Sequence, residues 1–160
     1  MFPRVAAFQI ASLAILASVG CSNAPSRLDP PGIPEEAGQA AVTKYDANGD
    51  GSIGGDELAK VPALKVTLKR VDKNGDGLVT ADEINERIAA WQKSRVALTR
   101  VAATVRRDGR PLSGVVVTLV PESFLGDAVK AAKGTTDGSG NVHLEISSDP
   151  DERGVHLGYY

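Results

Sequence analysis

The chain has 160 residues, of which 18 are Lys or Arg and 20 are Asp or Glu, so its formal net charge is −2. Because the charges balance and aromatic residues make up only 4% of the chain, the composition argues against a nucleic-acid-binding protein. The length allows two small domains and excludes one large core.

The first twenty residues are typical of an export signal. Arg4 supplies a positive start, and residues 5–19 are apolar except for one glutamine and two small serines. This run is shorter than a membrane-spanning helix requires. We therefore predict that residues 1–20 form a signal peptide and that the protein is exported.

The apolar run is followed by Cys21, the only cysteine of the chain. This junction resembles the lipobox of bacterial lipoproteins, in which the cysteine is lipidated and becomes the new N-terminus, although Ser18 stands where that family prefers Leu. The resemblance implies an extracytoplasmic protein that a lipid on Cys21 anchors to a bacterial membrane. A plain secretory signal with an incidental cysteine is the alternative. Residues 21–38 contain four prolines and predict a flexible linker.

Two stretches, residues 46–57 and 72–83, share one pattern of oxygen-bearing residues. Each has Asp, Asn, Asp and Glu at positions 1, 3, 5 and 12, and Gly at position 6. Calcium takes about six to eight oxygen ligands, and a loop of this kind also offers the backbone carbonyl of position 7. The predicted ligands are Asp46, Asn48, Asp50, Ser52 and Glu57 in the first loop and Asp72, Asn74, Asp76, Leu78 and Glu83 in the second.

A solvated turn is the alternative for any stretch rich in Asp, Asn and Gly. Here the full pattern occurs twice, and apolar residues at helical spacing occupy 64–71 and 84–91, before and after the second loop. Three carboxylates face one another in each loop, so we expect them to raise one another's pKa. A bound divalent cation would remove that repulsion and stabilise the fold.

With these loops and flanks, residues 39–92 resemble an EF-hand pair of the helix–loop–helix calcium-binding superfamily. The resemblance implies that the position-8 residues, Ile53 and Val79, pair through a short two-stranded bridge. The connection between the loops is short for this family, and Pro62 suits the first turn of the second helix within it. The helix that leaves the first loop should therefore be barely longer than one turn.

The EF-hand pair, assigned to residues 39–98, is expected to hold two calcium ions in a structural or buffering role. Calcium sensors expose a methionine-rich groove when they open. This chain has only one methionine, Met1, so a calmodulin-like switch is not expected.

The remaining residues, 99–160, carry the signature of short strands separated by turns. Asp108-Gly109 marks a tight turn, and residues 114–120 form a β-branched run. The segments 107–121 and 134–138 are similar to carboxypeptidase regulatory-like (transthyretin-like) β-sandwich modules. About sixty residues supply fewer than the roughly seven strands of a full sandwich, so we expect an open edge that could bind a protein partner.

Taken together, these patterns predict an α+β multidomain protein, with an all-α EF-hand pair followed by a small, incomplete antiparallel β-sandwich. The expected function is calcium binding by an exported, lipid-anchored protein. The alternative is an extracytoplasmic adhesion or scaffold protein, in which the sandwich binds a partner and calcium is ancillary. No nucleophile–base pair, zinc motif or phosphate-binding loop is present in the sequence, so we do not expect an enzyme.

Overall fold

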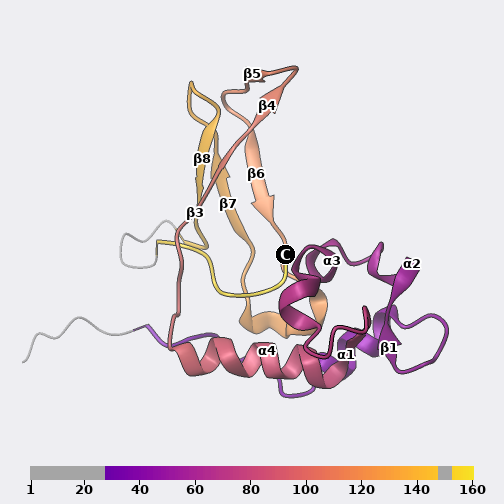
Figure 1. The fold of residues 1–160 in the computed structure, drawn as a ribbon. Helices are drawn as coiled ribbons and strands as arrows, with labels where there is room; N and C mark the ends of the chain where they lie inside the picture. Colours follow the sequence, from indigo (N-terminus) through magenta and orange to yellow (C-terminus); the bar gives the residue numbers. More distant parts are fainter. Residues whose placement is uncertain (1–27, 148–152) are drawn as a thin grey trace, which may run out of the picture.

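The computed structural model describes residues 28–147 and 153–160. A helical part comes from the first half of these residues, and strands from the second half stand above helix α4 (Figure 1). The predicted signal peptide, Cys21 and the first residues of the predicted linker lie outside the described residues. Within the described residues, no helix combines the length and apolar character needed to cross a membrane.

The helical part contains four helices and one short antiparallel ladder. Ile53 lies opposite Val79 in the ladder, which confirms the predicted pairing of the position-8 residues. The helix after the first loop is one turn long, and Pro62 is the first residue of the next helix, both as predicted. The elements are α1 (Ala37–Tyr45), β1 (Ser52–Ile53), α2 (Gly55–Leu58), α3 (Pro62–Val71), β2 (Val79–Thr80) and α4 (Ala81–Ser94).

Helices α1 and α4 cross closely at Gly38. The Gly38 amide donates a hydrogen bond of 2.8 Å to Oδ1 of Asn85. A Cβ atom at position 38 would collide with the carbonyl oxygen of Ala81, so this approach requires glycine. The helices enclose a core of buried apolar side chains, which includes Ala41, Val42, Leu64, Ile84 and Ile88.

The β part consists of two main antiparallel ladders and a small hairpin. The ladders pair β3 with β8 and β6 with β7, and the bridge between Lys133 and Glu145 joins them. Asp108 and Gly109 both have positive φ (51° and 77°) and form the predicted tight turn of the hairpin. The strands are β3 (Val101–Thr104), β4 (Arg106–Arg107), β5 (Arg110–Pro111), β6 (Val116–Leu119), β7 (Ala132–Thr135) and β8 (Asn141–Leu144).

A second, smaller core fills the β part. Val142 and Leu144 of β8 are buried against Ala132 of β7. Gly134 lets β8 lie close to β7, since a Cβ atom there would collide with the carbonyl oxygen of His143. The predicted α+β fold, with helices followed by small antiparallel sheets, is confirmed.

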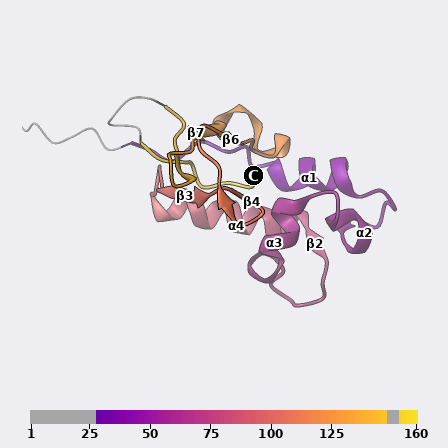
Figure 2. The same cartoon turned by 90° about the horizontal axis from the view of Figure 1, so that it is seen from above.

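The helical part and the β part also share a core. The 3₁₀ segment η1 (Ser123–Ala128) lies beside α1 (Figure 2) and places Phe124 and Leu125 among the buried residues of the helices. The ring of Tyr159 stacks at an angle against Trp91 of α4, with 4.9 Å between centroids, and lies 5.7 Å from Phe124. The sequence did not predict this contact between the two parts.

The end of the predicted linker differs from the prediction. Ile33 is only 6% exposed and belongs to the helical core, and its carbonyl oxygen accepts a hydrogen bond from Gln92. Helix α1 already begins at Ala37, within the predicted linker of residues 21–38. Ile33 and the start of α1 are packed because their apolar side chains fill space beside α4. The number of prolines in the segment does not reveal this packing.

The buried hydroxyl of Tyr159 generates a first prediction. Tyr159 is 2% exposed, its hydroxyl has no hydrogen-bond partner among the described residues, and burial raises its pKa far above the usual value. Because an unsatisfied buried polar group costs about 1–3 kcal/mol, we expect Tyr159→Phe to leave the free energy of unfolding unchanged or to raise it by about 1 kcal/mol. Denaturant unfolding measures this change.

Tyr160→Phe is the matched control. The Tyr160 hydroxyl donates a hydrogen bond of 3.2 Å to the carbonyl oxygen of His156. Its removal should lower the free energy of unfolding by up to about 1 kcal/mol. An equal loss in both variants would contradict the interpretation of the Tyr159 hydroxyl.

Candidate metal centre

The first predicted loop, residues 46–57, folds around the carboxylate of Asp46. Oδ1 of Asp46 accepts hydrogen bonds from the amides of Gly49 (2.7 Å) and Asp50 (3.2 Å), and Oδ2 accepts one from Gly51 (2.8 Å). Gly51 has a φ of 86°, which glycine adopts without strain. The turn at position 6 therefore aims successive amides at the first carboxylate.

The middle of the same loop is held by Asp50. Its Oδ1 accepts hydrogen bonds from the amide (2.9 Å) and hydroxyl (2.7 Å) of Ser52, and its Oδ2 accepts one from Nδ2 of Asn48 (2.8 Å). The Ser52 hydroxyl, followed by the Asn48 amide, lowers the pKa of Asp50 below its ordinary value. The carboxylate is thus kept ionised by its own loop.

Glu57, at position 12, closes the loop from the first turn of α2. Its Oε1 accepts hydrogen bonds from the amides of Ala47 (2.7 Å) and Asn48 (3.1 Å), and its Oε2 accepts one from Gly54 (3.1 Å). Glu57 is only 8% exposed. A buried carboxylate that bonds to both ends of the loop fixes the distance between them.

The second loop, residues 72–83, repeats this arrangement. Asp72 accepts hydrogen bonds from the amides of Gly75 (2.6 Å) and Gly77 (2.9 Å). Asp76 accepts one from Nδ2 of Asn74 (2.8 Å). Equivalent positions of the two loops therefore make equivalent bonds, as expected if the two stretches are two copies of one motif.

Glu83 combines its place in the second loop with a capping role in α4. Its carboxylate accepts hydrogen bonds from the Lys73 amide and from the amide and hydroxyl of Thr80, all at 2.9 Å. The Glu83 amide in turn donates to the Thr80 hydroxyl, which forms a capping box. The Glu83 side chain therefore couples the second loop directly to the start of α4.

The charge of Asp72 raises the pKa of Glu83, as expected of neighbouring carboxylates, but the net pKa of both Asp50 and Glu83 is lowered. Burial is the largest influence on Glu83 and would raise its pKa, and the charge of Asp72 adds a small effect in the same direction. Hydrogen bonds from Thr80 and Lys73 outweigh both, so the pKa of Glu83 is lowered. The hydrogen-bond donors beside each carboxylate decide whether its pKa rises or falls, and composition does not reveal them.

The donor chemistry of both loops fits calcium. The sequence of each loop contains the three carboxylates, one side-chain amide and one backbone carbonyl of the predicted ligand set, all of them hard oxygen donors. In residues 28–147 and 153–160, however, no group of three or more His, Cys, Asp or Glu is gathered closely enough to hold a metal ion. The glutamates at position 12 bond to backbone amides instead, so the assignment of the ten ligands stays a prediction.

The two loops touch through a contact that the twelve-residue pattern does not encode. The side chain of Leu78, for which only a backbone role was predicted, lies over Gly54 of the first loop, where a Cβ atom would collide with it. Together with the pairing of Ser52 with Thr80, this contact places the two loops side by side. A glycine and a partly exposed leucine give no sequence signal for such packing.

Comparison with known proteins finds one match, and it lies over the two loops. A family model described as EF hand matches residues 43–62 and 64–88, which contain both loops. This match supports calcium binding by the chain. No curated protein and no solved structure matches the chain.

The ligand assignment predicts the effect of removing two charges. The double variant Glu57→Gln and Glu83→Gln should weaken calcium binding by more than about tenfold, because each position would lose the charge of a two-oxygen ligand. Titration calorimetry measures the affinity and the number of ions bound. Glu86→Gln, an exposed glutamate of α4 outside the loops, is the matched control and should bind as the unaltered protein does. Unchanged affinity in the double variant would refute the assignment.

Proposed function

We propose that this protein binds two calcium ions, one in each of the loops 46–57 and 72–83, and that the ions serve a structural or buffering role. The observation that carries the proposal is the repetition of one oxygen-rich loop, paired through β1 and β2, within the segments that match the EF-hand model. A bound calcium ion would supply the positive charge that neutralises the carboxylates of each loop.

The loops prepare their oxygens for a cation by means of their own backbone. The amides of Gly49 and Gly51 orient Asp46, and those of Gly75 and Gly77 orient Asp72. Side chains held in this way lose less conformational entropy when they bind a ligand. Binding with little rearrangement is therefore favoured at position 1 of each loop.

Contacts between α1 and η1 favour a structural role over a switch. The Tyr45 hydroxyl donates a hydrogen bond of 2.6 Å to Glu122, and the Lys44 ammonium donates one of 2.7 Å to Ser123. A large opening of the helices would break these bonds and expose the core that both parts share. Helix α2 is only one turn long, so it is too short to produce a large movement of the helices.

We further propose that residues 1–20 direct export and that a lipid on Cys21 anchors the protein to the outer side of a bacterial membrane. The support is the apolar segment that precedes a single cysteine. Extracytoplasmic calcium is plentiful, so loops of modest affinity would stay occupied there. We propose no catalytic role.

An adhesion or scaffold function is the second candidate. It is favoured by strand β6, which pairs on one side only within the part of the chain that the structure describes. Removal of calcium by a chelator distinguishes the candidates, because a partner that stays bound after chelation makes calcium ancillary.

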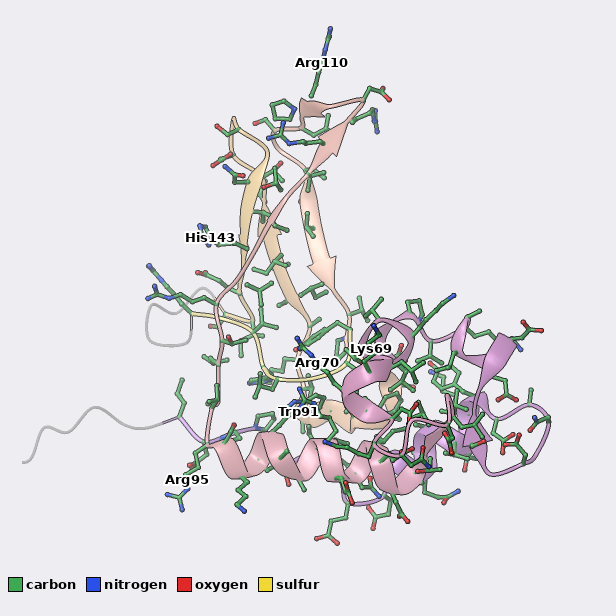
Figure 3. The ribbon with its side chains drawn as sticks, in the orientation of Figure 1. Lys69, Arg70, Trp91, Arg95, Arg110 and His143 are labelled. Carbon is green, nitrogen blue, oxygen red and sulfur yellow. The ribbon has the colours of Figure 1, made fainter. Side chains whose placement is uncertain are left out.

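The position of Trp91 predicts an optical signal for calcium binding. Trp91 lies on α4, the helix that Glu83 caps, and its side chain extends toward the base of the strands (Figure 3), where it stacks on Tyr159. Calcium at the second loop should therefore change Trp91 fluorescence in a saturable way. Trp91 is the only tryptophan of the chain, so the signal has one source. The double glutamine variant should give a flat titration, and a flat titration of the unaltered protein would argue against the coupling.

The proposed anchor predicts the outcome of cell fractionation. Cys21→Ala should move the protein from the membrane fraction to the soluble fraction and should abolish labelling with a radioactive fatty acid. Ser22→Ala, one residue further along, is the control and should leave both unchanged. Fatty-acid labelling of the Cys21→Ala protein would rule out Cys21 as the attachment site.

A further inference from the structure

Strand β6 has one edge that no other strand covers among the described residues. It pairs with β7 alone, with Val117 opposite Gly134. Val115 and Thr136 are bonded to each other just before this ladder, since the Thr136 amide donates to the Val115 carbonyl at 2.9 Å. Because bonded pairs alternate along an antiparallel ladder, the backbone groups of Val116 and Thr118 point to the open side.

The open edge is uncharged and strongly β-forming. Residues 112–120 contain no charged side chain, and five of the nine are valine or threonine. Val116 and Val120 are 63% and 67% exposed. Proteins usually protect such an edge with a charge, a proline or a bulge. A bulge, in which Gly114 and Val115 both bond to Thr136, lies before β6, and Pro121 follows it, but Val116–Leu119 carries none of these devices.

The outer strand of the other ladder makes a useful comparison. Strand β3 carries two alanines at its centre, which have low β propensity. It is also bounded by Arg100 and Arg106, so charge lies at both ends of its open edge. Pairing with another chain is therefore favoured at β6 and not at β3.

We infer that β6 is a homodimerisation edge, at which two copies of this chain pair β6 with β6 in antiparallel fashion about a two-fold axis through Thr118. A second copy fits because an uncharged strand that pairs with itself brings no like charges together. In this register Val116 of one copy lies opposite Val120 of its partner, and Thr118 lies opposite Thr118. Valine pairs and threonine pairs are both favourable neighbours across strands.

The geometry of β6 suits this arrangement. Val116, Thr118 and Val120 are all exposed, and so share the outer face of the strand, whereas Val117 and Leu119 face the core of the β part. Pairing would join the β6–β7 ladders of the two copies, and a sheet of more strands is more stable than one of few. The helical part adjoins the C-terminal end of β6 (Figure 1), so the two helical parts would lie at opposite ends of the shared sheet.

Analytical ultracentrifugation of the full-length protein over a range of concentrations tests the inference. The unaltered protein should show the mass of two chains at high concentration and dissociate on dilution. Thr118→Lys should sediment as single chains, because like charges would meet on the axis, and Thr118→Glu should weaken the dimer less, because Lys133 lies opposite it on β7. An equimolar mixture of the two variants should restore the dimer, because the introduced lysine of one copy faces the introduced glutamate of the other only in the inferred register.

Thr135→Lys is the matched control. Thr135 is exposed on β7 opposite Val116, one strand away from the open edge, so the same substitution there should leave the dimer intact. Circular dichroism and Trp91 fluorescence report whether each variant is folded. A protein that stays a single chain at every concentration, a Thr118→Lys variant that still dimerises, or a mixture that fails to associate would overturn the inference. Calcium titration is a separate measurement, so failure here leaves the proposed function standing.

Discussion

The ring of Tyr159 packs between Trp91 of α4 and Phe124 of η1, and this contact joins the two parts of the molecule. Phe124, Leu125 and Val129 belong to the same buried core as the apolar residues of α4. Tyr160, the next residue, contacts both the helical core and the core of the β part. The Tyr159 hydroxyl has no partner among the described residues, a cost that the packing of its ring would offset.

Both loops are built so that local hydrogen bonds hold negative charge in place. Each loop carries three carboxylates, and backbone amides at positions 4 and 6 meet the first of them. The same bonds that lower the pKa of Asp50 also restrict its orientation. Hydrogen bonds within each loop therefore orient the carboxylates that a divalent ion would use.

Several local features of both parts could be predicted because their determinants are short-range. Glycine at position 6, proline at the start of α3 and the Asp108-Gly109 turn each act through the backbone of adjacent residues, and each lies where the sequence indicated. Long-range packing could not be predicted in this way. Ile33 reads as part of a proline-rich linker, yet it is buried beside Gln92, and only the folded arrangement of α4 creates that site.

The size of the second core explains why the β part depends on the helices. Its fully buried members include Ala132, Val142 and Leu144, too few for an independent domain of this length. The ladders are therefore stabilised by packing against the helical core through Tyr160 and η1. Any ion that stabilises α4 through Glu83 also stabilises the surface against which Tyr159 packs. The helical core therefore connects the two loops to the strands through Tyr159, Tyr160 and η1 together.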